Sequence, residues 1–209
     1  MDRDIEVKMI KAVLFDWGGV LIDNPAPGLM DYCAKVLGVP VEDYVRVHNA
    51  HGEAFQKGLI AEEVFWQRVC GDLDRPLPQR SSLWGDAFRA VYRPCAEVFA
   101  LVRRLREGGI KTSLLSNTEV PAMEFFFELG YDMFDALTFS CAEGVFKPQR
   151  EIYEVAAGQV RTPPARCVLI DDRLDFIEGA RNAGMKGIVY QDLEQVKKGL
   201  TGLGVEVGR

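Results

Sequence analysis

Short apolar runs alternate with helix-length amphipathic segments through most of this chain, and this alternation is what most constrains its fold. The runs with the length and composition of buried strands are Met9–Phe15, Ile110–Leu115, Ala136–Phe139, Cys167–Ile170 and Gly187–Tyr190. Between and after the later runs, helical spacing covers Glu97–Glu107, Glu119–Leu129, Glu151–Val160, Phe176–Ala183 and Leu193–Leu200. Near-continuous apolar strands separated by helices are typical of parallel sheets covered on both faces. The sequence therefore predicts an α/β fold with a Rossmann-like parallel sheet flanked by helices.

One long segment interrupts the alternation. Residues 24–92 contain no strand-like run and carry apolar residues at helical spacing instead. Proline-containing stretches bound the segment on both sides. We therefore expect residues 1–23 and 93–209 to form the α/β core, and residues 24–92 to form an inserted helical cap above the strand ends. Residues 1–8 are expected to be a short extension before the first strand.

Composition narrows the classes of partner and the compartment. The 209 residues carry a net charge of −6 and an isoelectric point near 5.1, which argues against a nucleic-acid-binding surface. No apolar run approaches the length of a membrane span, and the charged N-terminus does not resemble a signal peptide. The five cysteines show no CxxC spacing, so we expect reduced thiols in a cytoplasmic protein.

Polar side chains follow the predicted strands at the points where the strands end. The carboxyl ends of parallel strands meet at one edge of the sheet, where such folds bind ligands. We therefore expect these side chains to lie close together. They are Asp16 after the first strand, Ser116 and Asn117 after the second, Lys147 after the third, and Asp171 and Asp172 after the fourth.

Each of these signals also has a structural interpretation. Asp16 before two glycines suits a turn. The segment Ser116–Glu119 has the S-x-x-E spelling of a helix capping box. Asp171, Asp172 and Asp175 suit a helix N-terminus, where carboxylates are favoured. The functional interpretation is favoured because all of these signals occur in order at successive strand ends.

Four motifs together resemble the haloacid dehalogenase superfamily of hydrolases. They are FDWGGVL at Phe15–Leu21, LLSNT at Leu114–Thr118, FKPQREIY at Phe146–Tyr153 and LIDDRLDFIEGA at Leu169–Ala180. A helical insert between the first and second motifs resembles the subclass with an alpha-helical cap. Within the insert, Phe55–Phe65 resembles the glucose-1-phosphate phosphatase and epoxide-hydrolase N-terminal-like group.

The resemblance implies a magnesium-dependent phosphomonoesterase that acts on a small phosphorylated metabolite, such as a sugar phosphate, through an aspartyl-phosphate. It assigns the nucleophile, the phosphoryl-binding groups and the Mg²⁺ ligands. The nucleophile is Asp16; Ser116, Asn117 and Lys147 bind the phosphoryl group; Asp16, the Gly18 carbonyl and Asp171 hold Mg²⁺; and Asp172 and Asp175 support the metal from its outer shell. This chemistry is reasonable in itself, because a carboxylate that attacks a phosphate needs Mg²⁺ and fixed donors to offset the charge.

One position departs from the pattern of the superfamily. Most of its phosphatases carry Asp two residues after the nucleophile, where it protonates the leaving oxygen, and this chain has Gly18 there. Three explanations stay open: a leaving group good enough to depart unprotonated, a proton from Asp23, His48 or His51, or weak activity.

The rivals are a 2-haloacid dehalogenase, a catalytically weak protein that binds a phosphorylated ligand, and a phosphonoacetaldehyde hydrolase. The last would need a cap lysine, either Lys35 or Lys57. The substrate and the oligomeric state are left open.

Overall fold

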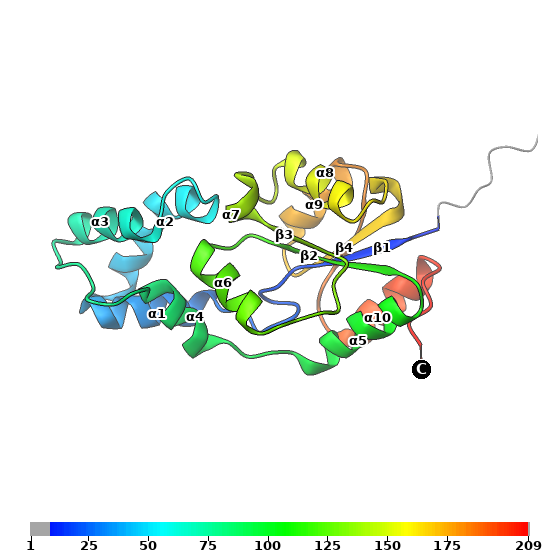
Figure 1. Cartoon of the computed structure of the whole chain (residues 1–209), viewed down its shortest axis with the longest axis horizontal. Coiled ribbons are helices and arrows are strands. Elements are labelled where there is room, and N and C mark those ends of the chain that lie inside the picture. Colours follow the sequence, from blue (N-terminus) through cyan, green and yellow to red (C-terminus); the bar gives the residue numbers. More distant parts are fainter. Residues whose placement is uncertain (1–8, 209) are drawn as a thin grey trace, which may run out of the picture.

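Five parallel strands form the centre of the molecule. The computed structural model describes residues 9–208, so the expectation for residues 1–8 lies outside the described range. The strand order is β3-β2-β1-β4-β5, and Figure 1 shows the sheet nearly edge-on. The strands are β1 (Ala12–Phe15), β2 (Lys111–Ser116), β3 (Ala136–Phe139), β4 (Cys167–Asp171) and β5 (Lys186–Val189). Each predicted run overlaps one of them, and the predicted α/β class with a parallel sheet is confirmed.

The central strand β1 is buried on both faces. Its residues alternate between the faces, so Ala12 and Leu14 join one core cluster and Val13 and Phe15 join the other. Figure 1 shows α8 and α9 on the first face and α5 and α10 on the second. The helices after the cap are α5 (Ala96–Glu107), α6 (Val120–Glu128), α7 (Ser140–Glu143), α8 (Arg150–Gln159), α9 (Leu174–Asn182) and α10 (Leu193–Gly202), with a 3₁₀ turn η1 (Pro164–Arg166) before β4.

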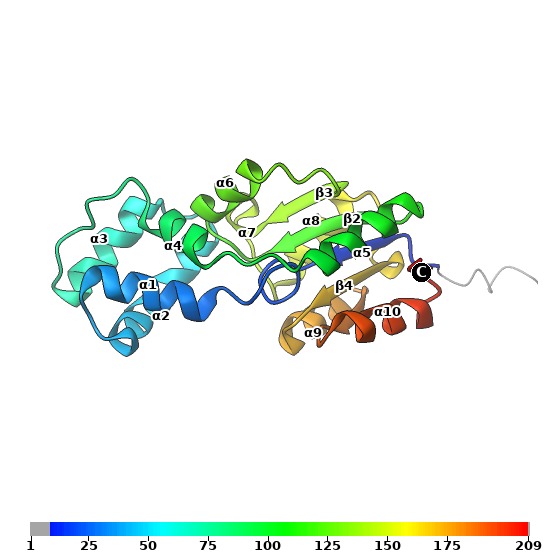
Figure 2. The same ribbon diagram turned by 90° about the horizontal axis from the view of Figure 1, so that it is seen from below.

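The segment between β1 and α5 is helical. Figures 1 and 2 show its helices beyond the carboxyl ends of the strands. They pack around buried aromatic rings, among which Phe55 and Phe65 stack with centroids 4.5 Å apart. The helices are α1 (Ala26–Leu37), α2 (Val41–Gln56), α3 (Glu62–Leu73) and α4 (Leu83–Val91). We propose that residues 24–92 act as a cap domain on a core of residues 1–23 and 93–209.

The chain leaves and re-enters the sheet region at one place. The Asp23 backbone N–H donates to the Arg93 carbonyl at 2.9 Å, and Ile22 and Pro94 form an isolated antiparallel bridge. A second junction lies at α7, where the Ser140 hydroxyl is 2.6 Å from the Gln56 carbonyl at the end of α2. The helical segment is therefore held to the sheet region at its base and at the strand edge.

Two features of the structure relate to the expectations about membrane spans and cysteines. Across the described range, no helix has the length and hydropathy that crossing a bilayer requires. The five cysteines, all of which lie in that range, are free thiols.

Candidate active site at the carboxyl edge of the sheet

Asp16 stands immediately after β1 and faces a cavity. Its backbone N–H donates to the Ile170 carbonyl at 2.9 Å, so the sheet ladder fixes the start of the turn. Its Oδ1 accepts from the Trp17 backbone N–H at 2.8 Å. These two contacts hold the carboxylate at the carboxyl edge of the sheet, where the residue is only 7% exposed.

Lys147 joins the polar ends of three strands. Its Nζ lies 2.8 Å from Asp16 Oδ1, 2.6 Å from Asp171 Oδ2 and 3.1 Å from the Leu115 carbonyl. An ammonium group has three N–H donors, and three acceptors surround this one. Burial lowers the pKa of Lys147, but the attraction of Asp16 and Asp171 outweighs that effect and raises the pKa above its usual value. The lysine is therefore a fixed positive charge beneath the two carboxylates.

Burial also controls the ionisation of Asp16. Desolvation raises the pKa of this carboxyl to about 7, while the nearby Lys147 charge acts to lower it and Asp171 acts to raise it. A cation on the cavity side would act in the same direction as Lys147, because it favours the ionised carboxylate.

Asn117 is bonded to the loop that carries Lys147. Its Nδ2 donates to the Lys147 carbonyl at 2.9 Å, and its Oδ1 accepts from the Lys147 backbone N–H at 2.8 Å. The predicted substrate-binding amide therefore has both polar atoms in a clamp on Lys147. Asn117 does line the cavity, but the contacts support a positioning role.

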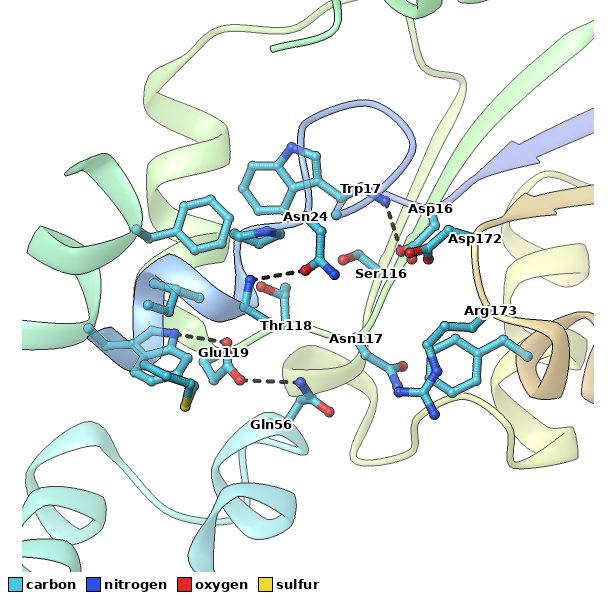
Figure 3. Close-up of a pocket in the computed structure, with 18 of the residues that line it drawn as sticks. Asp16, Trp17, Asn24, Gln56, Ser116, Asn117, Thr118, Glu119, Asp172 and Arg173 are labelled. Carbon is cyan, nitrogen blue, oxygen red and sulfur yellow. Dashed lines mark hydrogen bonds between the residues drawn. The ribbon is translucent and has the colours of Figure 1, made fainter. Parts of the chain in front are cut away.

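Ser116 is the last residue of β2, and Figure 3 shows it at the Asp16 end of the cavity. The capping-box interpretation of Ser116–Glu119 is wrong, because α6 begins only at Val120 and Glu119 is its N-cap residue. The pairing of β2 with β3 extends through Ser116, which keeps this residue in strand geometry.

Three carboxylates converge at the edge of the sheet. Ligand oxygens of Asp16, Asp171 and Asp172 all lie within 4.8 Å of one another. Three hard oxygen donors so close together fit Mg²⁺, which prefers carboxylates with substrate phosphate and water. Gly18, whose carbonyl is the further predicted ligand, lies in the cavity wall. The donor set therefore fits the ion that the resemblance implies.

The two neighbouring aspartates have different partners. Asp171 accepts from Lys147 through Oδ2 and from the Arg173 backbone N–H through Oδ1 at 2.9 Å, and it is fully buried. Asp172 lines the cavity, and burial together with repulsion from Asp171 raises its pKa. A bound cation would relieve that repulsion, so we propose Asp172 as a direct ligand, where the sequence suggested an outer one. Lys147 pairs with Asp16 and Asp171, and Asp172 is not among its ion-pair partners.

Gly19 makes room for Asp172. Gly19 has a φ of +82°, and a Cβ there would lie 2.4 Å from Asp172 Oδ2. Gly18 is also confined, because a Cβ on it would lie 2.9 Å from Cδ of Pro25. The turn after β1 therefore lies directly against the β4 loop. Asp175 is elsewhere: it pairs with Arg173 at 2.6 Å on the surface and is outside the carboxylate cluster.

The cavity has a volume of about 260 Å³ and lies between the strand ends and the cap. From the cap, His48 and Gln56 line it, together with Trp84, Phe88 and residues of α1. His51 instead pairs with Asp72 at 2.8 Å on the outside of the cap. Three other residues of the cap helices are outside its lining: Glu53, Phe55 and Trp66.

Glu119 is the lining residue that sequence reasoning missed as a site residue. Its carboxylate accepts from Trp84 Nε1 at 2.9 Å and from Gln56 Nε2 at 3.3 Å, and it is only 6% exposed. Burial raises its pKa to about 7. The sequence signal that could have identified Glu119 is its position three residues after Ser116. The capping-box pattern offered a different interpretation of that position, as part of a helix cap.

Comparison with known proteins defines the class. The sequence profile of haloacid dehalogenase-like hydrolases matches residues 10–184. This match covers most of the chain, so the chain belongs to the haloacid dehalogenase-like hydrolases, as its motifs predicted, and it is an enzyme of that family.

Particular relatives include two phosphatases. The chain is 27% identical to a sesquiterpene phosphatase of Aspergillus oryzae over 87% of this chain and 90% of the relative. It is 34% identical to a glyceraldehyde 3-phosphate phosphatase of Methanopyrus kandleri over 89% and 88%. A family enzyme of Bacteroides thetaiotaomicron, solved with magnesium and inorganic phosphate, superposes with a TM-score of 0.67 at 20% identity, covering 90% of this chain and 98% of that one. At that identity the superposition shows a shared fold.

Proposed function

We propose that this hydrolase cleaves phosphate monoesters of small molecules with the help of Mg²⁺, through a phosphoryl group carried on Asp16. The observation that carries the proposal is the buried Lys147 ammonium, 2.8 Å from Asp16 and 2.6 Å from Asp171, beside a third carboxylate in the same cavity. The phosphatase names of the relatives and the magnesium and phosphate bound to the structural neighbour support it.

Each residue then has a part in the reaction. Asp16 attacks phosphorus, so its bond to phosphorus forms as the bond to the leaving oxygen breaks. Ser116 donates to a phosphoryl oxygen, and Lys147 offsets the charge beneath the reacting carboxylate. Water then attacks phosphorus, which releases inorganic phosphate and restores Asp16.

Asp16 and Asp172, with the Gly18 carbonyl, would hold Mg²⁺. The ion, when bound, supplies a positive charge that polarises the phosphoryl oxygens. Asp171 would keep Lys147 in place from the opposite side, since its oxygens bond Lys147 and the Arg173 backbone.

The positions and surroundings of Asp23, His51 and His48 argue against each of them as the donor of the leaving-group proton. Asp23 is exposed and outside the cavity lining, and His51 pairs with Asp72 on the outer face of the cap. His48 does line the cavity, but burial lowers its pKa, so it is a poor acid near neutral pH. We therefore favour substrates whose leaving groups depart without protonation, such as aryl, anomeric or acyl phosphates.

The test is phosphate release from p-nitrophenyl phosphate and a set of phosphorylated metabolites, with and without Mg²⁺. We expect turnover with Mg²⁺ and at least a thousandfold loss in Asp16→Asn. Glu178→Gln, a charge change on an exposed residue of α9 outside the cavity, is the control and should keep its activity. Full activity in Asp16→Asn would remove Asp16 as the nucleophile.

The same assay separates the rivals. A 2-haloacid dehalogenase would release halide and be insensitive to chelators, and the three converging carboxylates favour the metal-dependent reaction. A binding protein would retain phosphate without turnover. A phosphonoacetaldehyde hydrolase would need a cap lysine in the cavity, but Lys35 and Lys57 are outside its lining, and Lys57 pairs with Glu53 at 2.6 Å. A cytoplasmic location stays part of the proposal, supported by the free cysteines.

A further inference from the structure

The cavity has two chemically different ends. Figure 3 shows Asp16, Ser116 and Asp172 at one end and Glu119 with Gln56 at the other. Between them lie Asn24 and Thr118 (Figure 3), and the lining also includes the larger apolar side chains of Leu29, Met30, Trp84 and Phe88. A phosphate seated at Asp16 would therefore direct the rest of its substrate past both polar and apolar side chains toward Glu119.

Glu119 has no cationic partner in the cavity wall. Both of its donors, the Trp84 indole and the Gln56 amide, are neutral, and the second is long at 3.3 Å. Among the described residues that line the cavity, Arg173 is the only Lys or Arg, and it is bound to Asp175. An ionised carboxylate has about four acceptor sites and is costly to bury without compensation. Above about pH 7, where it is ionised, Glu119 thus retains acceptor capacity and an unbalanced charge inside the cavity.

We propose that Glu119 determines specificity by accepting a hydrogen bond from a donor group, ammonium or hydroxyl, at the far end of the leaving group. This inference rests on the proposed phosphatase function and names its substrate class. The carboxylate matches such a donor, whereas a second phosphate or carboxylate on the substrate would be repelled by it.

The position of Glu119 suits this role. It is the N-cap residue of α6, yet no hydrogen bond from that helix holds its side chain. Its hydrogen bonds go instead to α2 and α4 of the cap, and its contact with Trp84 crosses 35 residues of sequence. The proposed specificity residue therefore follows a strand of the sheet, while two side chains of the cap orient its carboxylate.

The test compares three aryl phosphates with similar leaving oxygens. They differ only at the para position: methyl, hydroxymethyl and aminomethyl. In the wild type, we expect kcat/KM for one donor-bearing compound to exceed that for the methyl compound at least tenfold. Preference for aminomethyl identifies ammonium as the donor, and preference for hydroxymethyl identifies hydroxyl. A methyl compound that is as good or better overturns the proposal, whatever the variants do.

The variant Glu119→Gln keeps the shape and removes the charge. We expect it to lose at least tenfold of the preference for the aminomethyl compound, with the methyl compound changed by less than threefold. If hydroxyl is the donor, Glu119→Leu should show the loss instead, because Gln still accepts. An equal fall for all three compounds would show that Glu119 only joins cap and core. Glu178→Gln is the control and should keep the wild-type ranking.

Binding of the matching arylphosphonates, which cannot be hydrolysed, gives a readout without turnover. Calorimetric dissociation constants should rank as the kcat/KM values do. Glu119→Gln should flatten the ranking if ammonium is the donor, and Glu119→Leu should flatten it if hydroxyl is the donor. Ranked binding without phosphate release from any ester would refute the phosphatase proposal and leave the Glu119 assignment standing. Phosphate release with unranked binding would refute the Glu119 assignment alone.

Discussion

Lys147 organises the charges of the site at the scale of single residues. Its three donors meet two carboxylates and one carbonyl, and no part of its side chain is exposed. Removing one member of such a buried group leaves the others as uncompensated charges, which costs more than the pair itself contributes. The Lys147 ammonium is therefore important both for the stability of the fold and for the proposed reaction.

Lys147→Met should therefore be both inactive and less stable. We expect a loss of about 3–5 kcal/mol in the free energy of unfolding, measured by urea denaturation at pH 7. Lys197→Met, which breaks the surface pair with Glu194, should cost less than about 1 kcal/mol. Equal costs for the two variants would contradict the structural role of Lys147.

Glu119 makes a second prediction at the residue scale. Its pKa is raised by burial from 4.5 to about 7, so the folded state holds a proton that the unfolded state has released between those values. Its contribution to stability is therefore lost as pH rises through this window. Relative to the wild type, Glu119→Gln should gain about 1–3 kcal/mol in the free energy of unfolding between pH 5 and pH 8.

Urea denaturation of both proteins at the two pH values measures this difference. The titratable groups near Glu119 are present in both proteins. They are Cys33, Tyr44, His48, Glu62 and Cys141. The three whose pKa Glu119 raises, Cys33, Tyr44 and Cys141, titrate above the window. The same pH dependence in the two proteins would show that Glu119 is ionised throughout the window.

At the scale of elements, the turn after β1 and the loop after β4 are fitted to each other. Gly19 allows Asp172 to approach because it has no Cβ and adopts a positive φ. The carboxylates of two different strands can share one ion only if these two loops stay this close.

Gly19→Ala should weaken Mg²⁺ binding as well as stability. The new Cβ would stand 2.4 Å from Asp172 Oδ2 and displace that carboxylate. Gly109→Ala is a matched control, since Gly109 has the same φ of +82° but open space around it. We expect both variants to lose about 1 kcal/mol or more from backbone strain. Only Gly19→Ala should raise the Mg²⁺ concentration for half-maximal activity, by tenfold or more; equal Mg²⁺ dependence would contradict the fit.

At the scale of the whole molecule, the site lies where the cap, the β1 turn and the β4 loop meet. A ligand that binds only the folded state stabilises the entire chain by mass action. At a free Mg²⁺ concentration one hundred times its dissociation constant, the gain is about 2.7 kcal/mol.

Thermal unfolding with and without Mg²⁺ should show this stabilisation, and a chelator should reverse it. Asp172→Asn should lose most of the shift if Asp172 is a direct ligand, while the exposed Asp175→Asn should keep it. The opposite pattern would indicate that Asp175 supports the metal and that Asp172 is not a direct ligand.

The sequence by itself determined the sheet, the helical insert and the gathering of Asp16, Ser116, Lys147 and Asp171. These follow from apolar periodicity and from the rule that parallel strands present their carboxyl ends at one edge, so patterns within a few residues are enough. The strands could be located from local apolar patterns without knowledge of distant contacts. Each predicted run accordingly overlaps an observed strand.

Only the tertiary structure decided which partner each polar side chain takes. Asn117 binds the backbone of Lys147 across 30 residues, and Glu119 turns from its own helix to Trp84 across 35. A local motif such as S-x-x-E cannot predict such pairings, because a buried carboxylate takes whichever donors the packed cap brings within reach. The sequence therefore predicted the carboxylate and lysine end of the cavity, while the surroundings of Glu119 at the other end depend on how the helical segment packs on the sheet.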